Sequence, residues 1–141
     1  MMKTLLSATL ALALATPALA ATQSREENLA HPQGWSAVAG MEPRAVREMA
    51  RTLPLSDVAT DDQPWCGRNA EIESTLRHDF DEEKVATVAA EDTTLWGSDL
   101  MGTWTVVLER PDATSCVIAS GIGFRDGANP GTFLSRAGLN G

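Results

Sequence analysis

Residues 103–110 read TWTVVLER, and this stretch predicts the central strand of the fold. From Trp104 onward, apolar side chains at every second position alternate with more polar ones, and a period of two places them on one face of a sheet. The proline and aspartate at 111–112 are typical of a turn. The sequence SCVIA at 115–119 predicts the next strand, which returns as the antiparallel hairpin partner of the first.

Two further strands are predicted upstream of this hairpin. Residues 84–90 (KVATVAA) have the β-branched character of a strand, and residues 93–96 predict a short second one. The Gly-Ser-Asp sequence at 97–99 then provides a turn before the central strand. The sequence therefore predicts an antiparallel sheet of three or four strands.

A helix is predicted over residues 70–80. Its apolar residues Ile72, Leu76 and Phe80 recur every four positions, which is typical of a helix with one buried stripe. A helix followed by an antiparallel sheet indicates an α+β fold in which the helix packs on the sheet. We expect it to lie against the sheet face that carries Trp104.

The chain has two cysteines. Cys66 precedes the predicted helix, and Cys116 lies in the last predicted strand. In an oxidising compartment such a pair predicts one structural disulfide. A metal site would need more Cys or His ligands, and redox catalysis usually uses Cys-x-x-Cys. By closing a loop of about fifty residues, the bridge would stabilise this small domain by about 4 kcal/mol. It requires the two Cα atoms to lie within about 7 Å of each other.

Segments with weaker patterns flank the compact domain, which we assign to residues 65–124. Residues 21–64 predict a flexible segment containing one amphipathic helix, 42–53, with Pro43 in its first turn. Docking of this helix on the domain is favoured over presentation of its apolar face to a partner. Residues 125–141 are rich in glycine and lack apolar periodicity, so we expect a flexible tail whose removal barely changes stability.

Residues 1–20 have the three parts of a cleavable signal peptide. Lys3 supplies a positive charge, residues 5–15 form an apolar Leu/Ala run, and residues 18–20 (ALA) form a cleavage site. The apolar run is too short for a transmembrane helix, which needs about twenty residues. We expect a mature protein that begins at Ala21 and is periplasmic or secreted.

The chain is acidic, with a formal net charge of −8. This charge disfavours nucleic acid and anionic membrane surfaces as partners, and it is compatible with a cationic protein. The expected partner is an unknown envelope or secreted protein. The sequence contains no phosphate-binding loop, dinucleotide fingerprint or basic stripe, so no cofactor is predicted.

Several motifs between residues 66 and 124 resemble those of small exported bacterial proteins of unknown function. The pattern is a Cys before a helix, GTWT at 102–105 and CVIASG at 116–121. The chain departs from it at Ala113, where the turn usually has Gly, and near Phe80, where Tyr-Gly-Glu is common. The resemblance implies an exported, disulfide-bonded domain, and it implies no activity or binding residues.

Few residues could carry catalysis. His31 lies in the segment expected to be flexible, and His78 lies near the helix end, where an exposed histidine commonly interacts with the helix dipole. Ser120 does not lie in a Gly-x-Ser-x-Gly motif. The acidic residues at 79–83 would begin an EF-hand loop only with Gly at position 84 and Glu at position 90, where this chain has lysine and alanine. No catalytic or metal-binding residue is predicted.

Four tryptophans occur in a chain without tyrosine. We expect Trp104 in the core and Trp65 against the disulfide. Trp35 and Trp96 lie in loop-like contexts, and they are the candidates for a binding surface. The favoured function is a non-catalytic binding or accessory domain of the cell envelope. The alternative is a small secreted hydrolase using acidic residues, which a concave cleft with converging carboxylates would favour.

Overall fold

The computed structural model describes residues 33–56 and 60–139. The predicted signal peptide, its cleavage site before Ala21 and His31 lie outside these residues. No helix within the described ranges has the length and apolar character needed to cross a membrane.

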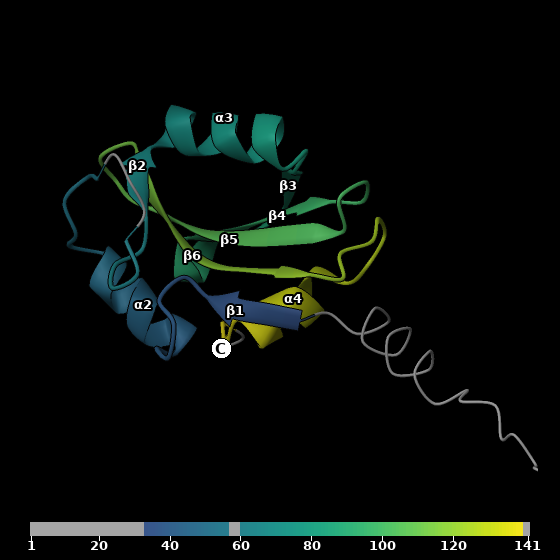
Figure 1. Ribbon diagram of the computed structural model, residues 1–141, viewed down its shortest axis with the longest axis horizontal. Coiled ribbons are helices and arrows are strands. Elements are labelled where there is room, and N and C mark those ends of the chain that lie inside the picture. The colour runs from purple at the N-terminus through teal and green to yellow at the C-terminus, as the bar shows by residue number, and fades with distance from the viewer. Residues whose placement is uncertain (1–32, 57–59, 140–141) are drawn as a thin grey trace, which may run out of the picture.

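An antiparallel sheet of six strands forms the centre of the molecule (Figure 1). Its order is β1-β6-β5-β4-β3, and β2 also pairs with β6. The strands are β1 (Gln33–Ser36), β2 (Cys66–Arg68), β3 (Glu83–Val88), β4 (Thr93–Ser98), β5 (Thr103–Glu109) and β6 (Thr114–Ile122). The four predicted strands are confirmed, and the α+β class with them. The sheet has more strands than predicted because β1 and β2 are too short to show alternation.

The long strand β6 organises the sheet. One of its edges pairs along β5, while the other pairs first with β2 and then with β1. The register between β5 and β6 shifts between Val106 and Val107, which marks a β-bulge. A bulge bends the strand and increases its twist, so β6 can reach partners in different directions with its two halves.

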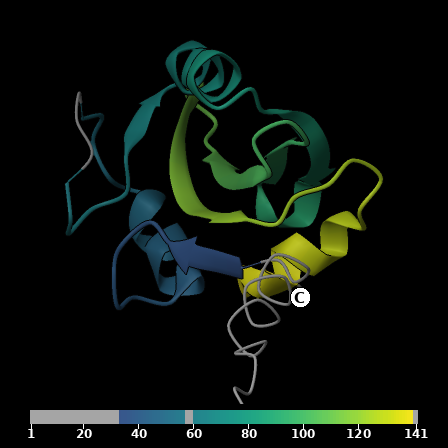
Figure 2. The ribbon, with the colours of Figure 1, turned by 45° about the vertical axis from the view of Figure 1, so that its right-hand side comes forward.

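Three α-helices of the described chain cover the two faces of the sheet. They are α2 (Pro43–Ala50), α3 (Asn69–Asp79) and α4 (Pro130–Arg136), and the 3₁₀ turn η1 (Ala89–Glu91) joins β3 to β4. Figure 1 shows α3 on one side of the sheet and α2 and α4 on the other. Seen from a second direction, the sheet curls toward α3, so this helix lies over the concave side (Figure 2).

Each face of the sheet has its own core. The larger core lies under α2 and α4, and there the Phe133 ring centre is 5.7 Å from that of Trp104 and 5.3 Å from that of Phe124. The smaller core lies under α3 and contains Ile72, Leu76, Trp96 and Val107.

The helix α3 therefore packs on the face opposite Trp104, and the predicted packing face was wrong. β5 is buried on both faces, since Val107 is as well covered as Val106. Alternation in a strand with two buried faces does not tell which face receives the helix. Phe80, expected in the buried stripe, lies just after α3 and is exposed.

The predicted disulfide is confirmed. Cys66 and Cys116 are bonded with their Cα atoms 4.0 Å apart, and they are direct partners in the β2–β6 register. The bridge joins the strand immediately before α3 to the last strand, as expected. Its sulfur atoms belong to the larger core, where the Cys116 Sγ is 3.5 Å from the carbonyl oxygen of Ala50. Trp65 packs with the smaller core on the other face, so it does not cover the bridge.

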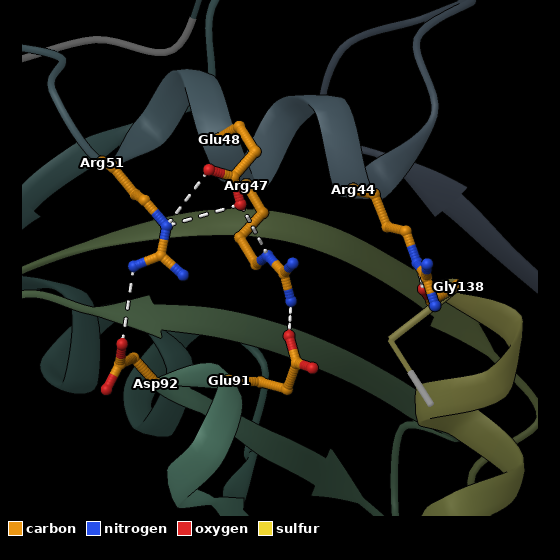
Figure 3. A network of polar contacts seen from close by, with 7 residues as sticks. All are labelled: Arg44, Arg47, Glu48, Arg51, Glu91, Asp92 and Gly138. Atoms are coloured by element: carbon orange, nitrogen blue, oxygen red, sulfur yellow. Dashed lines mark hydrogen bonds and ion pairs between the residues drawn. The ribbon is translucent and has the colours of Figure 1, made fainter. Parts of the chain in front are cut away.

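The helix α2 docks on the domain, as favoured, with Val46 and Ala50 buried. Two arginines of α2 and Arg51 just after it reach three different partners, as Figure 3 shows: Arg47 pairs with Glu91, Arg51 with Asp92, and Arg44 donates to the carbonyl oxygen of Gly138. At the end of α2, Arg110 donates to the carbonyl oxygens of Ala50 at 2.9 Å and Leu53 at 2.5 Å. These bonds satisfy carbonyl groups that a helix C-terminus leaves unpaired.

The predictions of flexible segments were wrong where the structure describes them. Within 21–64, β1 pairs with β6 and α2 packs on the core. Within 125–141, α4 begins after Asn129, whose side chain caps the helix by accepting from the Gly131 N–H at 2.9 Å. Its Phe133 side chain is 0% exposed. A helix this short contributes too few apolar residues to show a period among so many glycines.

Candidate functional site

A pocket with a volume of about 440 Å³ opens between α3 and the curled sheet. Its wall is mainly apolar, with Trp65, Leu76 and Val117 among the lining residues. The lining comes from α3, β1, β5, β6 and the segment that leads into β2. This position between a helix and a sheet makes the pocket the candidate functional site.

One row of cross-strand neighbours builds the floor of the pocket. Trp35 on β1 lies opposite Ser120 on β6, and Ser120 lies opposite Thr105 on β5. Side chains of directly paired residues point to the same face of a sheet. These three residues all line the pocket, and Thr105 is in turn paired with Trp96 on β4, which lies in the core beneath α3.

Glu82 is the single carboxylic acid among the described residues that line the pocket, and it is 1% exposed. The turn after α3 places it there. Asp81 adopts a left-handed conformation with φ of 53°, and the Glu82 N–H donates to the Leu76 carbonyl oxygen at 2.9 Å. A left-handed residue and a backbone bond into the last turn are usual at a helix C-terminus. The carboxyl group is thus set between α3 and the start of β3.

The carboxyl group of Glu82 has an unusual environment. Neither of its oxygens has a hydrogen-bond partner among the described residues. Burial raises the pKa of Glu82 above its ordinary value of 4.5. The hydroxyl groups of Thr105 and Thr103 lie near it and oppose part of that rise, but neither reaches a hydrogen bond of ordinary geometry. The site therefore combines an apolar wall with one strongly polar group that lacks a partner.

Two cations near the end of α3, Arg77 on the helix and Lys84 on β3, make contacts with groups other than Glu82. Arg77 and Lys84 lie over the Trp96 ring, 5.4 and 5.5 Å from its centre. Arg77 pairs with Glu83 and Lys84 with Glu109, each at 3.6 Å. Neither cation neutralises the carboxyl group in the pocket, and no lysine, arginine or histidine is among its described lining residues.

Of the two tryptophans predicted for a binding surface, only one is on a surface. Trp35 is 54% exposed at the pocket. Trp96 is 2% exposed, because β4 extends through it and α3 covers it, so its assignment to a binding surface was wrong. His78 is exposed at the end of α3 and does not line the pocket. Three or more metal-ligating side chains do not converge anywhere in the described ranges.

Glu82 is the site residue that sequence reasoning missed. It stands in an acidic run at 79–83 that reads as a solvated helix end. Its neighbours Asp81 and Glu83 are exposed, as the run suggests. Glu82 is buried while its two neighbours are exposed because the chain turns after α3. No apolar periodicity in the sequence predicts that turn.

No family model, curated protein or solved structure matches this chain. A fold does not by itself imply a function, so the functional inference rests on the residues and shape of the pocket.

Proposed function

We propose that this chain is a non-catalytic binding domain of the cell envelope, and that its pocket under α3 takes a small, largely apolar molecule. The observation that carries this proposal is the pocket itself. Its volume of about 440 Å³ lies within the range of small-molecule sites, and its wall is apolar with few polar groups. The Cys66–Cys116 bridge supports a periplasmic or secreted location, because structural disulfides persist in oxidising compartments.

The mouth of the pocket supports binding of an apolar ligand. Trp35, Phe80 and Ile122 line it and are large apolar residues with exposed side chains. Exposed apolar residues gathered at one opening mark a recognition surface more often than isolated ones do. The concave shape favours an occupant smaller than the protein partner that the net charge suggested.

The alternative function, a hydrolase using acidic residues, has less support. Glycoside hydrolysis in its usual form employs two carboxyl groups on either side of the scissile bond. Among the described lining residues, Glu82 is the only group of that kind. The raised pKa of Glu82 would suit a general acid, but no second carboxylic acid stands beside it among the described lining residues.

A neutral apolar dye provides the test. N-phenyl-1-naphthylamine fluoresces in apolar surroundings, and we expect the wild-type protein to bind it with a saturable increase in fluorescence. Thr75→Trp should abolish the increase, because Thr75 lines the pocket from α3 and the larger ring would fill it. Ser74→Trp is the matched control, since Ser74 is the next residue on the same helix and is exposed.

Equal dye binding by both variants would overturn the proposal, and so would a wild-type protein that binds no dye. Ser120→Trp fills the same pocket from β6, so it replaces Thr75→Trp if that variant does not fold.

A further inference from the structure

Two polar residues of the pocket have buried side-chain atoms that lack a hydrogen-bond partner. Five buried side-chain nitrogen and oxygen atoms in the described chain lack a hydrogen-bond partner, and three of them belong to Glu82 and Thr103. Both residues line the same pocket. Buried polar groups in proteins are paired with few exceptions, and exceptions that gather in one place indicate a ligand site.

The chemistry of these groups indicates which ligand would pair with them. The two carboxylate oxygens only accept hydrogen bonds, whereas the Thr103 hydroxyl both donates and accepts, and a buried carboxylate is stabilised most by a cationic donor. An anionic ligand would add like charge beside Glu82. The lining contains four aromatic residues from separate segments, Trp35, Trp65, Phe80 and Trp104. Aromatic faces attract cations, and their edges do not.

The charge of the whole chain acts in the same direction. With a net charge of −8, the protein raises the local concentration of cations and lowers that of anions. Arg77 and Lys84, the two cations nearest in sequence, pair with Glu83 and Glu109 and leave the pocket carboxyl group available.

We propose that the ligand carries a protonated amine on an apolar body, and that the amine pairs with the carboxylate of Glu82 while the body lies against the aromatic wall. This inference rests on the proposed function, because it names the ligand class of the same pocket. The Glu82 oxygens lie just beneath the pocket surface, so the amine reaches them by a side-chain rotation at Glu82 or its neighbours.

Three probes that differ in one group test the charge preference. They are 2-phenylethylammonium, 2-phenylethanol and phenylacetate, titrated into the full mature chain at about pH 8 with tryptophan fluorescence or calorimetry as the readout. We expect the ammonium to bind at least about tenfold more tightly than the alcohol, and phenylacetate to bind most weakly.

The variant Glu82→Gln should remove the preference for the ammonium, so that the ammonium and the alcohol bind with similar affinity. Glu83→Gln is the matched control, because it makes the same change one residue along at an exposed position and alters the net charge equally. Its preference should match the wild type, which separates the pocket carboxylate from the general acidity of the chain.

The pH dependence provides a second readout that needs no variant. Glu82 is the single titratable group among the described lining residues from α3, the strands and the loop before β2. Protonating it removes the anionic partner, so the ammonium should bind more weakly at about pH 5 than at about pH 8, while the alcohol should change little.

Equal affinity for ammonium and alcohol, or tighter ammonium binding at the lower pH, would overturn this inference. If the neutral dye still binds, the pocket remains a binding site and only the ligand class is wrong. If neither dye nor probes bind, the proposed function fails as well.

Discussion

Trp104 requires glycine on two neighbouring strands. Its indole Nε1 donates to the Ile122 carbonyl oxygen at 3.1 Å, and its ring lies across Gly34 on β1 and Gly121 on β6. A Cβ atom at either glycine would come within 2.5 Å of a ring carbon of Trp104, closer than two carbon atoms can pack. Gly34 and Gly121 are direct partners in the register, so together they leave the flat surface on which the ring rests.

Two non-glycine residues occupy left-handed backbone positions at turns next to the site and the hairpin. Asp81 has φ of 53° and Ala113 has φ of 62°. An alanine there costs about 1 to 2 kcal/mol relative to glycine, because its Cβ approaches the next carbonyl oxygen. The positive φ at Ala113 is a backbone position that glycine occupies without this cost.

At the same scale, Glu82 makes stability depend on pH. Its pKa is raised in the folded protein, so the unfolded chain releases its proton first as the pH rises above about 4.5. The free energy of unfolding therefore falls as the pH rises from about 4.5 to the folded pKa, and the full penalty remains at every higher pH. Glu82→Gln should remove this penalty, so the melting temperature of the variant relative to wild type should rise by several degrees between about pH 4 and neutral pH.

Thermal melts over this pH range measure the effect, with Glu83→Gln as the control. Glu83 is exposed and its ion pair with Arg77 is a surface pair, which contributes little. A difference between Glu82→Gln and wild type that stays constant with pH would show that this carboxyl group titrates as it does in the unfolded chain.

Among the helices and strands, α4 differs most from the prediction, because its residues were expected to form a flexible tail. It closes the larger core, with Phe133 against Trp104 and Phe124. Arg44 of α2 reaches the Gly138 carbonyl oxygen just beyond it, which ties the two helices of this face together.

The buried ring of α4 gives a direct prediction. Phe133→Ala should lower the free energy of unfolding by about 3 to 5 kcal/mol, the usual cost of removing a fully buried phenylalanine. Thr132→Ala on the same helix is the control, because Thr132 is exposed and should change stability by less than about 0.5 kcal/mol. Denaturant melts compare the two. Equal stability of both variants would mean that α4 does not pack on the core, as the sequence had suggested for residues 125–141.

Elements with their own apolar period could be predicted from sequence, and elements held by distant contacts could not. The strands β3 to β6, α2 and α3 each span enough residues to show a period. β1 reads Gln-Gly-Trp-Ser and β2 reads Cys-Gly-Arg, and both exist because β6 offers them a free edge. The candidate site depends on those distant contacts. Trp35 could be named as a surface candidate from sequence, but its place beside Glu82 in one pocket could not be predicted.

For the molecule as a whole, the disulfide is the one covalent link between segments distant in sequence. It closes a loop with a sequence separation of 50 between the strand before α3 and β6. In the chain-entropy model such a loop contributes about 4 kcal/mol, so Cys66→Ser with Cys116→Ser should lower the free energy of unfolding by about 2 to 4 kcal/mol.

Chemical denaturation of the double variant and of the oxidised wild type measures this difference. The oxidised protein should show no free thiol with or without denaturant, because the chain contains only these two cysteines. Coinciding denaturation curves would mean that the register between β2 and β6 needs no covalent support.

The central place of β6 has a consequence for the order in which the protein can be assembled as it is made. β1 is synthesised early, but its sheet partner is residues 119–122 of β6, and α4 follows later still. The larger core cannot close until β6 and α4 have been synthesised, and contacts this distant in sequence form slowly. The complete sheet is therefore expected to form only after most of the chain has been synthesised.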